Sequence, residues 1–190
     1  MIATTRARGL GPLVASHLVC LVVNGPCPTS VAAEGGPDTP DPTSTPGKTD
    51  PNATVNDGGI RDICHTTTGN VRASLQPEAK REALRRYGLS GNCTGFCSGP
   101  QGCEIDHLIS LELGGSNEPD NLWPQQYDGK QWNAHVKDRL ENTLHVLVCR
   151  GTITLAEAQS AISGDWTAAF AKYVKVDPST ISGDGPTRCR

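Results

Sequence analysis

Residues 103–117 read CEIDHLISLELGGSN, and this stretch decides the fold that the sequence predicts. Strand-compatible apolar side chains recur along Cys103–Leu113, a pattern that favours a β-strand. The glycine pair at 114–115 and the polar residues as far as Asp120 then favour a turn. Residues 121–124, which read NLWP, fit a short return strand that ends at Pro124. We therefore expect a β-hairpin in this part of the chain.

A long helix is predicted to follow the hairpin over Lys130–Cys149. The apolar side chains that fall at helical spacing, and so mark its core face, are Trp132, Val136, Leu140, Leu144 and Leu147. The order strand, turn, strand and helix is a ββα unit. The sequence thus indicates an α+β fold.

Two further helices are expected around this unit. Pro77–Tyr87 begins with a proline suited to the first turn and is followed by Gly88, a residue that commonly ends helices. Thr154 and Glu157 have the spacing of a capping box, which predicts a helix that runs to about residue 174 with a break near Gly164.

The chain resembles the HNH, or His-Me finger, endonuclease superfamily from Cys103 to Glu141. The resemblance lies in EIDHLISLELGGSN at 104–117, NLWP at 121–124 and NAHVKDRLE at 133–141, and it is greatest to a branch of small exported bacterial proteins. It implies a ββα-metal core over about residues 103–149, with flanking helices and stabilisation by disulfides.

This resemblance gives roles to individual side chains. His107 corresponds to the general base that activates water, Asp106 to a ligand of one divalent metal, and Asn121 to the asparagine that holds the base imidazole. Histidine suits a base because its pKa lies near working pH. His135 and Asn133 compete for the remaining metal ligand, and we favour His135 because imidazole is the better ligand. The implied metal is Mg²⁺, with Mn²⁺, Ni²⁺ or Zn²⁺ as alternatives.

Two features of the residues themselves bear on these roles. Asp106 and His107 are neighbours in a strand, so their side chains are expected to point to opposite faces. Lys137 lies four residues before Glu141, which favours a structural ion pair on one helix face. The alternative is that Lys137 contacts a phosphate of the substrate.

The first third of the chain differs in composition from the rest. Residues 1–33 fit a secretory signal, with Arg6 and Arg8 before an apolar stretch and small residues at 31–33. A membrane anchor is the alternative, but the apolar stretch is shorter than the roughly 20 residues of a span. Residues 34–59 lack large apolar side chains, so we expect a disordered linker. The folded domain is then residues 60–190.

Removal of residues 1–33 leaves six of the eight cysteines. An even number in an exported chain is typical of disulfides. The candidates are Cys64, Cys93, Cys97, Cys103, Cys149 and Cys189. A zinc site that uses Cys93, Cys97 and Cys103 is the alternative.

The charge balance bears on the kind of partner. After removal of residues 1–33 the chain keeps 15 Lys and Arg residues against 20 Asp and Glu residues. This surplus of acids disfavours nucleic-acid binding unless a local basic stripe or a divalent metal offsets it. We expect a monomeric metal-dependent endonuclease acting on DNA or RNA, secreted or held in the cell envelope or periplasm, with no stable membrane association. A non-catalytic, disulfide-stabilised secreted binding module is the alternative.

Overall fold

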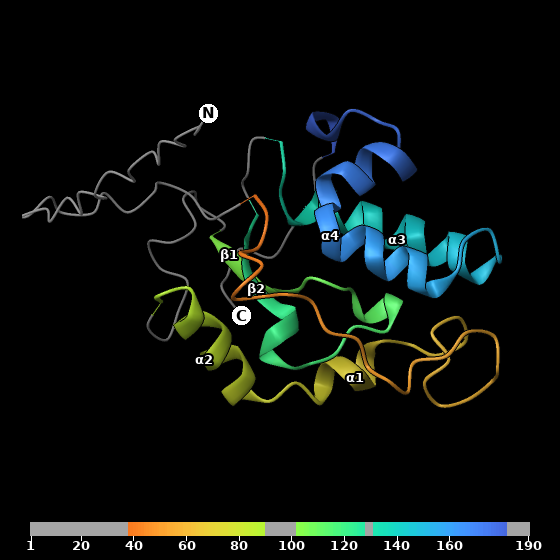
Figure 1. Cartoon of the computed structure of the whole chain (residues 1–190), viewed down its shortest axis with the longest axis horizontal. Helices are drawn as coiled ribbons and strands as arrows, with labels where there is room; N and C mark the ends of the chain where they lie inside the picture. The colour runs from red at the N-terminus through yellow and green to blue at the C-terminus, as the bar shows by residue number, and fades with distance from the viewer. Residues whose placement is uncertain (1–37, 90–101, 128–130, 182–190) are drawn as a thin grey trace, which may run out of the picture. The chain divides into compact units, whose positions relative to one another are not determined.

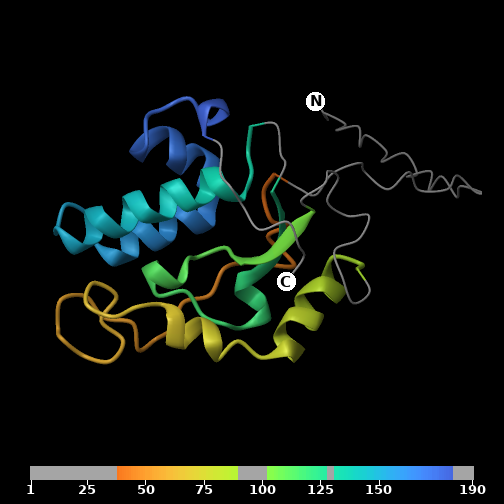
Figure 2. The ribbon, with the colours of Figure 1, turned by 180° about the vertical axis from the view of Figure 1, so that it is seen from behind.

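The computed structural model describes residues 38–89, 102–127 and 131–181 of the chain. Its regular elements are α1 (Gly69–Ala73), α2 (Pro77–Arg86), β1 (Cys103–His107), η1 (Leu111–Leu113), η2 (Pro119–Asn121), β2 (Leu122–Gln126), α3 (Ala134–Cys149), α4 (Leu155–Tyr173) and η3 (Pro178–Thr180). Helices α3 and α4 lie side by side on one side of the hairpin, and α1 and α2 lie on the other (Figures 1 and 2). The chain is thus mixed α and β, as predicted.

Strands β1 and β2 form the expected antiparallel hairpin, with His107 opposite Leu122 and Cys103 opposite Gln126. The first strand is shorter than predicted, because the apolar residues after His107 form the 3₁₀ turn η1. The second strand is longer, because Pro124 lies inside it rather than at its end. A proline is tolerated there because an edge strand leaves every second backbone nitrogen without a partner.

Glycines 114 and 115 allow the connection between the strands to fold tightly. Gly114 ends η1 with a φ of 71°, in the left-handed region that glycine adopts easily. A Cβ on Gly115 would lie 1.8 Å from the carbonyl oxygen of Ile109, so no side chain fits there. The glycine pair therefore fixes the path by which the chain returns to β2.

The main core lies between α3 and α4. Helix α3 buries Val136, Leu140 and Leu144 as predicted, together with Val148, whereas Leu147 is only half-buried. Helix α4 begins with the predicted capping box of Thr154 and Glu157. The residues of α4 that complete this core are Ala158, Ile162, Trp166, Ala169 and Phe170.

A kink in α4 corresponds to the predicted break. Asp165 has φ −153° and ψ 96°, outside the helical region. Beyond it, Trp166 and Phe170 each contact Trp132 in a T-shaped arrangement, at ring-centroid distances of 5.4 and 5.7 Å. Such edge-to-face contacts suit aromatic quadrupoles and close one end of the core.

Residues 38–59 differ from the predicted disordered linker, because they pack along the hairpin connection. Thr45 is 1% exposed and donates its hydroxyl proton to the carbonyl of Leu122. Gly47 N–H donates to the carbonyl of Asp120, and Ser116 N–H to that of Lys48. The segment has few apolar side chains. Its backbone N–H and C=O groups instead form hydrogen bonds with the rest of the domain, as those of a strand do within a sheet. Residues 34–37 of the predicted linker lie outside the described ranges.

Helix α2 agrees with the prediction to within one residue at its end, and Gly88 follows it with a φ of 71°. Helix α1 is a single short turn that the sequence analysis did not predict. Of the helices in the described ranges, none has the length and apolarity required to cross a bilayer.

Candidate active site

The two residues at the end of β1 that carry the proposed chemistry belong to different surroundings. Asp106 lies opposite Trp123 in the hairpin and binds Lys137 of α3. His107 lies opposite Leu122 and binds Asn117 in the connection between the strands. The side chains of the expected base and the expected metal ligand therefore have different partners.

Lys137 is fully buried, which contradicts the suggestion that it contacts a phosphate of a substrate. Its ammonium donates to Asp106 Oδ2 and to the carbonyl oxygen of His107, each at 2.7 Å, and to Glu141. Burial alone would lower the pKa of Lys137, but the charges of Asp106 and Glu141 raise it above its usual value. Lys137 is thus a permanent internal cation that joins α3 to β1.

Two carboxyl groups pair with this ammonium, and two more lie within its electrostatic reach. The acidic cluster consists of Glu104, Asp106, Asp138 and Glu141, two residues from β1 and two from α3. Burial and the neighbouring charge of Asp106 raise the pKa of Glu104 to about 7, and burial also raises the pKa values of Asp138 and Glu141. The raised pKa values mean that these carboxyl groups do not all ionise freely near neutral pH, so a cation bound among them would favour their ionised forms.

His135 lies at the edge of the acidic cluster. Its ring centroid is 5.6 Å from that of Tyr127, whose hydroxyl donates to Glu104 Oε2 at 2.7 Å. Within the described residues, no three ligand atoms of the cluster lie within 4.8 Å of one another. The oxygen-rich donor set with one imidazole fits Mg²⁺ or Mn²⁺ chemically, but the side chains must move together to hold the ion.

Two buried polar groups lie next to the cluster on the same face of the hairpin. Gln125, opposite Glu104, is 1% exposed, and neither its amide nitrogen nor its amide oxygen has a hydrogen-bond partner. The indole N–H of Trp123, opposite Asp106, also has none. Such groups are costly to bury unsatisfied, so this face has polar capacity that the described contacts do not use.

The imidazole of His107 is 4% exposed and donates its Nε2 proton to Asn117 Oδ1 at 2.8 Å. The amide nitrogen of Asn117 donates to the carbonyl of Val71 and to Ser74 Oγ, which fixes the orientation of the amide. A neutral His107 therefore carries its proton on Nε2 and keeps Nδ1 as the basic nitrogen. Burial lowers the pKa of His107 and outweighs the opposing charge of Asp106, so the ring is neutral near pH 7.

Asn121 does not hold the imidazole, which corrects the role expected from the resemblance. Its side chain is fully buried, accepts the backbone protons of Ile109 and Lys48, and donates to the carbonyls of Ile109 and Ser116. Asn121 thus closes the connection between the strands, and Asn117 is the residue that orients His107.

Asn133 and His135, the two candidates for the remaining metal ligand, have different structural roles. Asn133 is the N-cap of α3, where its side-chain oxygen accepts the N–H of Val136 at 3.1 Å. His135 is half-buried and has no such capping role. A metal ligand taken from Asn133 would therefore cost the helix its cap, whereas His135 is under no such constraint.

Four residues that matter in this geometry were missed by the sequence analysis, namely Glu104, Asn117, Tyr127 and Asp138. Glu104 was recoverable, because residues two apart in a strand share a face and Asp106 was already assigned. The roles of the other three depend on how the hairpin connection and α3 pack, which no local pattern encodes.

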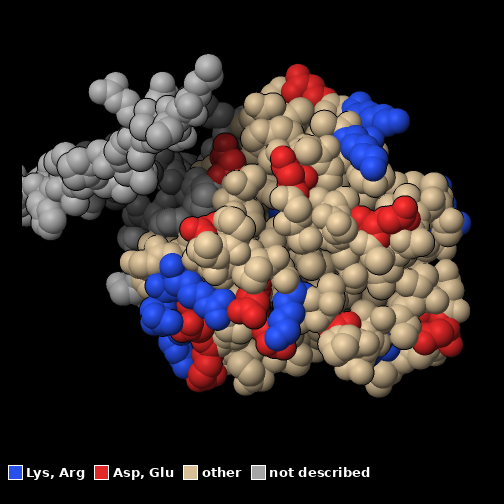
Figure 3. Space-filling model, in the orientation of Figure 1, with Lys and Arg blue, Asp and Glu red and all other residues tan. Residues whose placement is uncertain are grey.

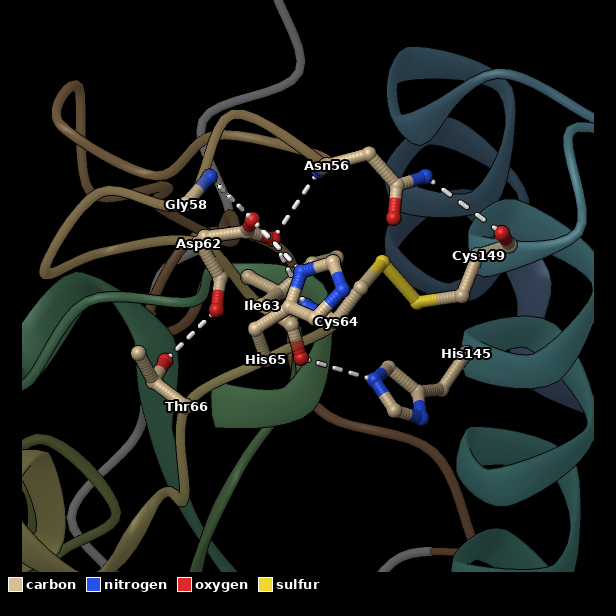
Figure 4. The surroundings of a disulfide bond; sticks show 9 residues. All are labelled: Asn56, Gly58, Asp62, Ile63, Cys64, His65, Thr66, His145 and Cys149. Atoms are coloured by element: carbon tan, nitrogen blue, oxygen red, sulfur yellow. Dashed lines mark hydrogen bonds and ion pairs between the residues drawn. A yellow bond between two sulfur atoms is a disulfide. The ribbon is translucent and has the colours of Figure 1, made fainter.

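A second group that could hold a metal ion consists of Cys64, His145 and Cys149, whose ligand atoms lie within 4.8 Å of one another (Figure 4). The two sulfur atoms form a disulfide, with the Cα atoms 5.6 Å apart. Because thiolates are the metal ligands, this group offers them only after reduction. His145 Nε2 also donates to the carbonyl of Ile63 at 2.9 Å, so it has a structural role in the oxidised chain.

The Cys64–Cys149 bond confirms that two of the candidate cysteines form a disulfide. Cys103 is buried in β1. Cys93, Cys97 and Cys189 lie outside the described residues. Comparisons with protein-family models, with curated proteins and with solved structures find no match for this chain.

Proposed function

We propose that this chain is a secreted metal-dependent endonuclease that hydrolyses phosphodiester bonds in DNA or RNA. The observation that carries the proposal is the acidic cluster next to His107, in which Asp106 and Glu141 pair with one buried ammonium while Glu104 and Asp138 lie within its electrostatic reach. A divalent cation bound there would replace the protons that these carboxyl groups otherwise retain and would favour their ionised forms. The resemblance to HNH endonucleases supplies the reaction.

In this proposal Asp106 and Glu104 hold the ion through the oxygens that Lys137 and Tyr127 do not occupy, and His135 supplies the imidazole ligand. The bound metal would stabilise negative charge on the phosphate and on the leaving oxygen. Lys137 keeps one oxygen of Asp106 fixed, so the other oxygen points in a defined direction.

The proposed base is His107, acting through Nδ1. Asn117 holds the Nε2 proton, so the imidazole is neutral and correctly oriented to take a proton from water. Because the ring is 4% exposed and Asn117 ties it to α1, water and substrate reach Nδ1 only after the covering side chains shift. The proposal therefore requires an opening motion near α1.

Cleavage of supercoiled plasmid by the purified chain tests this function. We expect nicking with Mg²⁺ or Mn²⁺, none with EDTA, and a loss of at least about a hundredfold in His107→Ala, the usual size of a base contribution. His65→Ala is the matched control, because that histidine is 61% exposed and lies outside the site. Full activity in His107→Ala would overturn the proposal.

A second candidate function is the non-catalytic secreted binding module. The burial of His107 and the occupation of Asp106 by Lys137 favour it, since both side chains then serve packing. It predicts that Mn²⁺ titrated into the chain gives no heat of binding, and that Asp106→Asn leaves the titration unchanged. Saturable Mn²⁺ binding that Asp106→Asn removes would exclude it.

A further inference from the structure

One short segment of this acidic chain has more basic than acidic residues. Residues 72–86 contain five Lys and Arg residues and two Glu residues, while the rest of the chain contains twelve Lys and Arg against eighteen Asp and Glu. We call residues 72–86 the basic segment. It joins the end of α1 to the whole of α2.

The basic segment lies on the surface. In Figure 3 a cluster of Lys and Arg side chains lies at the lower left, over α2, interspersed with acidic side chains. The side chains of Arg81 and Arg85 are 60% and 72% exposed. Their partners are Glu78 and Glu82 one turn away, and exposed pairs of this kind contribute little to stability. Phosphate oxygens can therefore replace these carboxylates without disturbing the fold.

The position of the basic segment links it to the proposed base. Helix α2 packs on both strands of the hairpin, and α1 supplies the carbonyl of Val71 that holds Asn117, the partner of His107. The electrostatic influence of Arg72 also reaches His107. The basic segment thus lies on the same side of the hairpin as the imidazole of His107.

An open cleft adjoins the start of the basic segment at Ser74. It has a volume of about 810 Å³ and is lined by Asn70 and Val71 of α1 and by Ser74, the C-cap of that helix. Ser116 and Asn117 line it on the side of the hairpin connection, and Arg61 lines it as an ion pair with Asp50. Hydroxyl and amide groups of this kind are the usual neutral partners of phosphate and sugar oxygens.

We propose that the basic segment binds the phosphate backbone of a nucleic acid and leads the strand into the cleft beside Asn117 and His107. The ten residues of α2 span about 15 Å, the axial length of about four successive phosphates in one strand of a duplex. The local charge answers the objection raised by the acidic composition. This inference rests on the proposed endonuclease function and names its substrate-binding surface.

Binding without catalysis tests the surface separately from the reaction. A fluorescein-labelled duplex of 20 base pairs is titrated with the full chain in EDTA, and anisotropy is measured at several salt concentrations. The test variant is Arg81→Gln/Arg85→Gln. The matched control is Lys172→Gln/Lys175→Gln, which removes the same charge from exposed residues at the end of α4.

We expect the test variant to bind the duplex at least about fivefold more weakly and to lose about 1 to 2 from the slope of log K against log salt. The control should stay within about twofold of wild type, because Lys172 and Lys175 lie outside the basic segment. If both variants bound the duplex equally weakly, the proposal that the basic segment is the binding surface would be wrong. The proposal would also be wrong if the wild-type chain bound neither the duplex nor an RNA of the same length.

The outcome is distinguishable from that of the plasmid assay. If wild type cleaves plasmid and both variants bind the duplex equally well, the basic segment is not the binding surface, and the proposed endonuclease function still stands. If binding depends on Arg81 and Arg85 but no cleavage occurs, the basic segment is supported as the binding surface and the proposed endonuclease function is contradicted. Circular dichroism of each variant checks that the fold is retained.

Discussion

Lys137 Nζ lies 2.7 Å from Asp106 Oδ2, and this buried ion pair fastens α3 to β1 one residue before His107. The same ammonium donates to the carbonyl oxygen of His107. One side chain thus sets the position of both residues that the proposed chemistry uses. The loss of Lys137 should therefore be felt in stability as well as in the site.

Replacement of Lys137 by Met should lower the free energy of unfolding by about 3–5 kcal/mol, because Asp106 and Glu141 are left in a buried place without their cation. Urea denaturation at neutral pH measures the change. Lys172→Met is the control, since an exposed lysine changes stability by at most about 0.5 kcal/mol. A Lys137→Met chain as stable as the control would show that the carboxyl groups take up protons at no cost.

Asn117 and Asn121 should separate orientation of the base from stability. Asn117→Ala removes the hydrogen bond that raises the pKa of His107, so the pKa should fall further below its usual value. Asn121→Ala leaves several buried backbone groups without partners and should cost at least about 2 kcal/mol of stability. NMR titration of the His107 ring and urea denaturation report the two effects. If Asn121→Ala shifted the His107 pKa more than Asn117→Ala did, the assignment of Asn117 would be wrong.

Glu104 should make stability fall as pH rises. Its pKa is raised to about 7 from an ordinary 4.5, so the folded state holds a proton that the unfolded state has released. The stability from this proton is full below pH 4.5 and is lost as pH rises through about 7. Melting temperatures between about pH 4 and about pH 8 should therefore decline more steeply for wild type than for Glu104→Gln.

Mn²⁺ adds a second condition to this comparison, because a cation next to Glu104 favours the ionised carboxylate. With saturating Mn²⁺ the wild-type decline between pH 4.5 and about 7 should flatten, and binding at neutral pH should release protons. Calorimetry in two buffers of different ionisation enthalpy measures that release. Parallel pH profiles of wild type and Glu104→Gln would contradict the role of Glu104.

The elements that local sequence patterns encode were predicted well. The capping box of Thr154 and Glu157, the glycine after α2 and the helical spacing of Val136, Leu140 and Leu144 each depend on residues a few positions apart. These interactions act within one element, so the sequence shows them directly.

The parts that depend on distant contacts were not predictable from such patterns. Residues 38–59 are ordered because their backbone groups bond to the hairpin connection more than 60 residues away along the chain. The bond between Asn117 and His107 depends in turn on α1, which holds the asparagine amide. The sequence analysis anticipated that Asp106 and His107 point to opposite faces of the strand. The residues that they contact on each face are determined by tertiary packing.

The disulfide between Cys64 and Cys149 closes a loop with a sequence separation of 85, so it should contribute substantially to stability. Replacement of both cysteines by Ser should lower the free energy of unfolding by about 2–5 kcal/mol, because the unfolded chain regains conformational freedom. Urea denaturation under non-reducing conditions measures the loss. His145→Ala is the matched comparison, since it removes only the hydrogen bond to the Ile63 carbonyl on the same pair of segments and should cost about 1 kcal/mol. If the double Ser variant were no less stable than His145→Ala, the cross-link would not be what holds α3 to the segment around Cys64.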